Sequence, residues 1–135
     1  MKLTLGSVVM LLMGREHWQI TIEERTMKKI EAIIRPEKLG AVKHALEEVG
    51  VHALTAYEVQ GRGEQKGLEF THRAGKFRVD MLPKTKLEIV VKEEKLEEAV
   101  SAICSMARTG EVGDGKIFII PVERAVKVRT GEVEP

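Results

Sequence analysis

A strand, helix, strand pattern occurs twice in this chain, and this repetition restricts the fold more than any other feature of the sequence. In the first copy, apolar Ile30, Ala32 and Ile34 alternate with their neighbours, as in a strand with one buried face. The following apolar residues recur at helical spacing until Gly50, and the whole pattern then repeats. The predicted strands are 30–34, 54–59, 87–91, 116–121 and 125–129, and the predicted helices cover about 36–49 and 96–107.

Two such halves predict an α+β, ferredoxin-like βαββαβ sandwich, in which one sheet carries both helices on one face. The opposite face of the sheet needs a cover of its own, so we expect an oligomer. About 25 residues, 60–84, connect the halves. Because this is too long for an ordinary connection in so small a domain, we expect a functional or mobile loop there.

Bulk properties exclude several classes of function. The chain has 135 residues, enough for one domain, and its 22 Lys and Arg against 21 Asp and Glu give a net charge of +1. Neither nucleic acid binding nor membrane binding is indicated by this balance or by an aromatic content of 4%. The single cysteine, Cys104, falls in a helical pattern, which predicts a small core residue and no disulfide. Because no disulfide is expected, we expect a cytoplasmic location.

Residues 1–26 precede the regular pattern. Their apolar run, 8–13, follows Lys2 as in a signal peptide, but no small-residue cleavage site comes after it. The run is also far shorter than the roughly 20 residues that cross a bilayer. We therefore expect an N-terminal extension or a start-site artefact outside the domain, which covers 27–135. Trp18 and the apolar run could form an added edge strand or a helix.

Two glycine-rich segments are candidates for binding an anion. The first, 109–118, contains Gly113 and Gly115, which permit a close backbone approach, with Lys116 beside them. The second, 61–67, also follows a predicted strand and also carries a lysine. An Asp-Gly turn is often only a connection, but two such loops could close on the same phosphates.

The sequence indicates neither a metal site nor a catalytic site. His44, His52 and His72 have no metal-ligand spacing, and the glutamate pairs at 47–48, 93–94 and 97–98 are typical of outer helix faces. No nucleophile has a recognisable base nearby.

Several segments together resemble the PII nitrogen-regulatory signal proteins. The similarity runs from Met27 to about Glu132. It rests on the residues Met27 to Pro36, Gln65-Lys66-Gly67, Leu82-Pro83-Lys84, Thr109-Gly110 with Gly113 to Phe118, and Val128 to Glu132.

This resemblance implies a homotrimer whose three inter-subunit clefts bind ATP or ADP and, with Mg-ATP, also 2-oxoglutarate. The ligands would set the shape of the 60–84 segment, which is called the T-loop in this family and which docks on a target. The chain would be a sensor without enzymatic activity. Arg73 stands where relatives insert an arginine into an ammonium transporter.

Position by position, the resemblance also implies ligand residues. Those for ATP are Ile33, Thr55, Gly63, Glu64, Gln65, Lys66, Glu88, Val90, Gly113, Asp114, Gly115, Lys116, Lys127 and Arg129, the last from the neighbouring subunit. Gln65 would also reach Mg²⁺. The 2-oxoglutarate would be held by Gln65, Lys66, Gly67 and Lys84.

Four positions depart from the family pattern. Phe77 replaces a tyrosine that is uridylylated in many relatives, and Gly75 replaces a serine that is phosphorylated in others, so neither modification is expected. Glu64 and Lys127 each stand where an arginine is usual. Both changes would weaken ATP binding, because Glu64 adds a negative charge and lysine lacks the bidentate contact of arginine.

Two other functions stay open at this point. The first is a regulator that acts directly on nitrogenase or another nitrogen-metabolism enzyme. The second, from a different class, is a small ATP-hydrolysing enzyme that uses the same phosphate loops.

Overall fold

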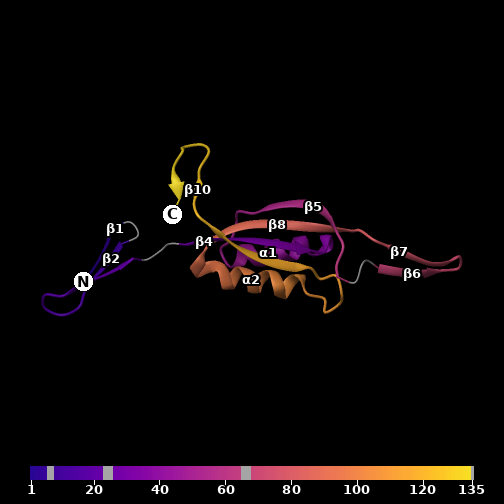
Figure 1. Cartoon of the computed structure of the whole chain (residues 1–135), viewed down its shortest axis with the longest axis horizontal. Helices are drawn as coiled ribbons and strands as arrows, with labels where there is room; N and C mark the ends of the chain where they lie inside the picture. Colours follow the sequence, from indigo (N-terminus) through magenta and orange to yellow (C-terminus); the bar gives the residue numbers. More distant parts are fainter. Residues whose placement is uncertain (6–7, 23–25, 65–67, 135) are drawn as a thin grey trace.

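The structure confirms that the strand, helix, strand pattern occurs twice between residues 27 and 122. A computed structural model describes residues 1–5, 8–22, 26–64 and 68–134. Its four-stranded sheet has the order β5-β8-β4-β9, and every neighbouring pair is antiparallel (Figure 1). The elements are β4 (Met27–Ile34), the 3-10 turn η1 (Pro36–Lys38), α1 (Leu39–Glu48), β5 (Thr55–Gly61), β8 (Leu82–Lys92), α2 (Glu93–Ala107) and β9 (Lys116–Val122). This is the strand order of the ferredoxin-like sandwich.

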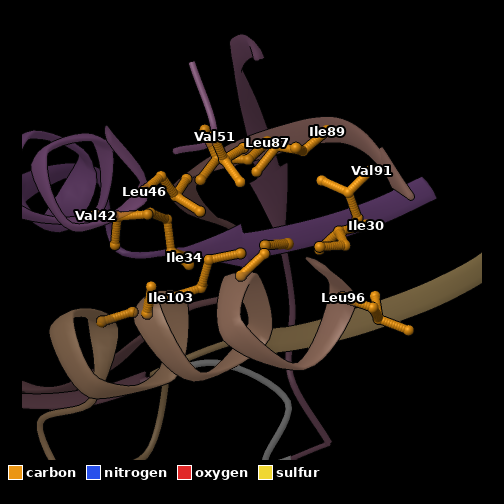
Figure 2. Close-up of a cluster of buried hydrophobic side chains, with 14 residues drawn as sticks. Ile30, Ile34, Val42, Leu46, Val51, Leu87, Ile89, Val91, Leu96 and Ile103 are labelled. Carbon is orange, nitrogen blue, oxygen red and sulfur yellow. The ribbon is translucent and has the colours of Figure 1, made fainter. Parts of the chain in front are cut away.

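Both helices pack against one face of this sheet. Alternate residues of the two central strands are buried, as the pattern of apolar residues predicts. They form one core with the inward sides of α1 and α2, and Figure 2 shows these side chains between the layers. The largest fully buried side chains are Ile30, Ile34, Val42, Leu46, Leu87, Ile89 and Ile103. The first helix ends where Gly50 takes a φ of 83°.

The other face of the sheet carries both ion pairs and exposed apolar side chains. In its centre, Lys29 lies 2.7 Å from Glu31, and Lys86 lies 3.5 Å from the same carboxylate. Around this cluster, Phe118 and Val90 are each nearly half exposed. No helix of the described chain covers this face.

The described part of the segment 60–84 contains regular secondary structure that the sequence did not predict. It forms a projecting hairpin, β6 (Leu68–His72) and β7 (Gly75–Val79), at one end of the molecule (Figure 1). Residues 82–84, predicted as loop, belong to β8, because Leu82 pairs with Gly61 and Lys84 pairs with Val59. Pairing with β5 therefore extends β8 beyond its apolar pattern.

The last predicted strand was too long. Strand β10 covers only Ala125–Val126 and pairs with β11 (Val133–Glu134). The chain turns between them, with the Lys127 N–H donating to Glu132 O and the Gly131 N–H donating to Lys127 O. Gly131 has a φ of 72°, which this turn requires. Arg129 therefore lies in the turn and not in a strand.

The N-terminal residues form a sheet of their own. Its strands are β1 (Lys2–Leu5), β2 (Val8–Leu12) and β3 (Trp18–Ile22), paired in that order. The apolar run thus forms a strand, but it is not an edge strand of the core. This small sheet lies at the end opposite the β6–β7 hairpin (Figure 1). Among the described residues, no helix combines the length and the apolar character needed to cross a bilayer.

Candidate functional site

The loop 109–115, between α2 and β9, lies directly on the backbone of β4. Gly113 and Gly115 have φ values of 98° and 103°, which favour glycine. A Cβ atom on Gly115 would lie 1.7 Å from the carbonyl oxygen of Ile33. Only glycine fits this position, because both the conformation and the space exclude a side chain.

The carboxylate of Asp114 holds this loop from within. Its Oδ2 accepts the N–H groups of Thr109 and Gly110, both at 2.9 Å. Its Oδ1 accepts the Thr109 hydroxyl and lies 3.3 Å from Nε of Arg35. The Thr109 hydroxyl, followed by the Thr109 N–H, holds the pKa of Asp114 well below its usual range. The carboxylate therefore stays charged throughout the physiological pH range.

Two cations reach the same loop from neighbouring strands. Arg35 follows β4 and donates through Nη2 to Val112 O at 2.7 Å. Lys84, in β8, donates through Nζ to Gly113 O. Burial, with Arg35 nearby, lowers the pKa of Lys84. A carboxylate entering between Lys84 and Arg35 would meet two positive charges.

Lys116 is the exposed cation at the end of the loop. Its Nζ lies 4.0 Å from Oε1 of Glu64, and both side chains are mostly exposed. The two glycine-rich segments of the sequence are thus brought together here. Gln65, Lys66 and Gly67, predicted to bind ATP, Mg²⁺ and 2-oxoglutarate, lie outside the described residues. Gly63 precedes them and is exposed.

A cavity of about 310 Å³ opens beside this loop, between α2 and the edge formed by β4 and β9. Four of the predicted ATP residues line it, namely Ile33, Asp114, Gly115 and Lys116. Its wall on the side of α2 is apolar and includes Cys104, which is half-buried and not fully within the core.

Four more of the predicted ATP residues line a second cavity, of about 850 Å³. They are Thr55, Glu88, Val90 and Lys127. Arg129 is exposed in the turn after β10. Figure 1 shows that β10 and the α2–β9 loop lie at opposite ends of the sheet. Within one chain, the predicted ATP residues therefore form two separate groups.

Glu88 belongs to the second group and is held by its neighbours on the open face of the sheet. The hydroxyl of Tyr57 donates to its Oε1 at 3.0 Å. Lys29 and Lys86 each lie 3.8 Å from the same oxygen. The hydrogen bond between Lys29 and Glu31 raises the pKa of the lysine and lowers that of the glutamate. This part of the open face can therefore present a fixed carboxylate to a ligand.

The β6–β7 hairpin carries the residues predicted for docking and modification. Phe70 and Phe77 pair across it and stack at 5.6 Å between ring centroids, although both are about half exposed. Arg73 lies in the exposed turn. Lys76 lies 3.5 Å from Glu69 on the other face of the hairpin.

Sequence reasoning missed Arg35 as part of the site. The only sequence signal was a cation at the end of a strand, before Pro36, and nothing local linked it to a loop 77 residues further along. The predicted surface position of His44 is confirmed, with Glu48 at 3.2 Å. No group of three or more metal-binding side chains occurs in the part of the chain that the structure describes.

The sequence is similar to known proteins over most of its length. The family model "Nitrogen regulatory protein P-II" matches residues 27–132. The nitrogen regulatory protein P-II 2 of Methanothermobacter thermautotrophicus is 54% identical over 106 residues, which are 78% of this chain and 92% of that protein. The P-II proteins of Cereibacter sphaeroides and Azospirillum brasilense are 54% and 52% identical over 106 residues, or 78% of this chain and 95% of each relative. The match to the family model leaves out the N-terminal sheet.

Proposed function

This chain belongs to the nitrogen regulatory protein P-II family, and on that premise we propose that it senses ATP or ADP together with 2-oxoglutarate. The assembly would be a homotrimer with the ligands in the clefts between subunits. The family match, the loop 109–115 and the division of the predicted ligand residues support this proposal.

The observation that carries the proposal is the division of the site into two parts. Ile33 belongs to the first cavity and Lys29, four residues along the same strand, belongs to the second. Four strand residues span about 13 Å. A single small group of a ligand bound in one cavity therefore cannot reach the other cavity. If two copies meet, the loop of one copy can face the second cavity of its neighbour. The open face of the sheet, with its exposed Phe118 and Val90, would be covered by the same assembly.

In such a cleft each end of the nucleotide has a matching group. Lys116 supplies a cation for the phosphates, and Arg129 of the neighbour would supply another. The carboxylate of Glu88 offers an acceptor for the amino group of adenine. Mg²⁺ prefers oxygen ligands and readily takes them from phosphates, so Mg-ATP can also accept the 2-oxo acid. Lys84 would bind the far carboxylate of 2-oxoglutarate.

Ligand binding would be passed on to the β6–β7 hairpin through the segment at its base. Glu64, next to the predicted ligand residues 65–67, lies beside Lys116. A ligand that binds one hairpin arrangement more tightly shifts the population toward it. The hairpin would then dock on an ammonium transporter or, in the alternative, on a nitrogen-metabolism enzyme, with Arg73 at its tip.

Calorimetric titration tests the sensing function directly. We would titrate 2-oxoglutarate into the full chain with Mg-ATP, with Mg-ADP and with no nucleotide, and measure the mass of the assembly by light scattering. The proposal predicts a trimer that binds 2-oxoglutarate only with Mg-ATP. A control titration of ATP alone gives the nucleotide affinity.

Three results would contradict the proposal. A monomer would remove the shared cleft, and absence of nucleotide binding would remove the sensor. Release of phosphate from Mg-ATP faster than about one per second, a turnover ordinary for enzymes, would favour the hydrolytic alternative.

A further inference from the structure

The loop 109–115 is ordered without a buried side chain of its own. Its one large apolar residue, Val112, is 56% exposed. Fixing each backbone residue costs about 1–2 kcal/mol of conformational entropy, and apolar burial does not offset this cost here. The polar contacts of Asp114, Arg35 and Lys84 are therefore what holds the loop in place.

The carboxylate of Asp114 has no free acceptor position for a ligand. A carboxylate offers about four, two on each oxygen. The two N–H groups of Thr109 and Gly110 fill Oδ2, and the Thr109 hydroxyl and Arg35 fill Oδ1. A negative charge in direct contact with phosphate would also be repelled. Contact between this side chain and the nucleotide therefore has little support.

Arg35 joins β4 to the loop at two points with one side chain. Its Nε faces Asp114 at 3.3 Å, while its Nη2 donates to Val112 O at 2.7 Å. A planar guanidinium can make both contacts from a fixed fork, whereas a lysine ammonium can act only as a point charge.

We infer that Asp114 and Arg35 are positioning residues, which hold the loop 109–115 in the shape that receives the nucleotide phosphates without touching the nucleotide themselves. The inference rests on the proposed nucleotide binding. It assigns Asp114 a different role from the phosphate contact that the sequence predicted. Preorganised N–H groups bind an anion more tightly because less ordering is required when the ligand arrives.

Substitutions that remove a negative charge can distinguish a positioning role from a purely electrostatic effect, because the two predict opposite changes in the affinity for ATP and ADP. Glu111→Gln removes a negative charge from the same exposed loop, so it should leave phosphate binding unchanged or make it slightly tighter. Asp114→Asn removes the same charge and also breaks the network, and we expect it to weaken ADP and ATP binding by about tenfold or more. Adenosine, which has no phosphate, should bind both variants as it binds the unmodified protein.

Arg35 is tested with two variants. Arg35→Lys keeps the charge and loses the fork, so we expect it to weaken ATP binding nearly as much as Arg35→Gln does. Lys43→Gln, which removes one positive charge from an exposed position of α1 outside both cavities, is the control and should have a much smaller effect. Kd values for adenosine, ADP and ATP are measured by calorimetry on the full chain.

Hydrogen exchange provides a second readout that does not depend on affinity. The amides of Thr109 and Gly110 should lose protection in Asp114→Asn, while amides of β4 and β8 keep theirs. Two results would overturn the inference. One is tighter ATP binding by Asp114→Asn, and the other is equal ATP binding by Arg35→Lys and the unmodified protein. If the unmodified chain binds no nucleotide, the proposed function fails, and unchanged exchange at Thr109 and Gly110 would then overturn the positioning role separately.

Discussion

Two glycine-rich segments look alike in the sequence and differ in the structure. The loop 109–115 is tied to β4 and β8 through Arg35 and Lys84. The hairpin 68–79, which extends from the second segment, projects away from the sheet (Figure 1). The difference indicates that the two segments have different roles. A fixed loop is suited to a binding site, whereas a projecting hairpin is suited to movement or to docking.

The largest expected effect tests how firmly the fixed loop is packed. Gly115→Ala places a methyl group where the Ile33 carbonyl already lies, and the φ of 103° adds strain. We expect it to lower the free energy of unfolding by about 2–4 kcal/mol, measured by urea denaturation. Gly110→Ala is the control: its φ is 88°, but no atom lies within 4 Å of the added carbon. Its cost should be only about 1 kcal/mol. Equal costs for the two variants would show that the close packing of the loop on β4 is unimportant.

The next prediction concerns what orders the hairpin. The stacked rings of Phe70 and Phe77 lie opposite each other, and such aromatic pairs contribute about 0.5–1.5 kcal/mol. Phe77→Ala should therefore open the hairpin and speed tryptic cleavage there by several-fold, with the global stability of the domain unchanged.

Two variants of the same hairpin make this test specific. Phe77→Tyr keeps the stacked ring and should be cut at the original rate. Thr71→Ala, on the opposite face of the hairpin, should also have little effect. If Phe77→Ala resists trypsin as well as the original chain does, the aromatic pair is not what orders this hairpin.

A smaller effect is expected where the two segments meet. Glu64 lies 4.0 Å from Lys116 and competes with a phosphate for that cation. Because exposed ion pairs contribute only about 0.2–1 kcal/mol, Glu64→Gln should tighten ATP binding by no more than about fivefold, and less at high salt. Calorimetry at two salt concentrations measures this, with Glu58→Gln as the control. Weaker ATP binding by Glu64→Gln would mean that Glu64 assists the ligand instead.

The smallest effect is a pH dependence. The pKa of Asp114 is lowered in the folded chain, so its contribution to stability is present above the ordinary carboxyl value of 3.8 and is lost as the pH falls below it. The difference in unfolding free energy between the unmodified protein and Asp114→Asn should therefore be constant from pH 7 to about pH 5 and shrink toward pH 3. A difference that shrinks between pH 7 and pH 5 would contradict the lowered pKa.

Much of the core was predictable because local patterns and burial agree there. The alternation in β4 and the helical spacing in α1 and α2 depend only on neighbouring residues, and the structure confirms all three elements. Strand ends were harder to predict. Lys84 lies in β8 because it pairs with Val59, and the 125–129 strand stops at Val126 because the chain turns to pair with β11.

In the N-terminal sheet, too, the local sequence pattern did not decide the secondary structure. Its apolar run predicted a strand or a helix, and the antiparallel pairing of β2 with both neighbours selected the strand. The division of the chain into an extension, residues 1–26, and a domain from residue 27 stays a prediction.

By itself, the sequence determined the fold class, the family and the glycine-rich loop before Lys116. The fold class and the loop depend on periodicity and on residues that are close together along the chain, and the family depends on the resemblance of several short segments between Met27 and Glu132. Only the tertiary structure decided that Arg35 and Lys84 contact the loop and that hydrogen bonds fill every acceptor position of the Asp114 carboxylate. It also decided that the predicted ATP residues form two groups. Such contacts join residues that are distant in sequence, and their geometry is set by how the strands pair and how the helices pack against them.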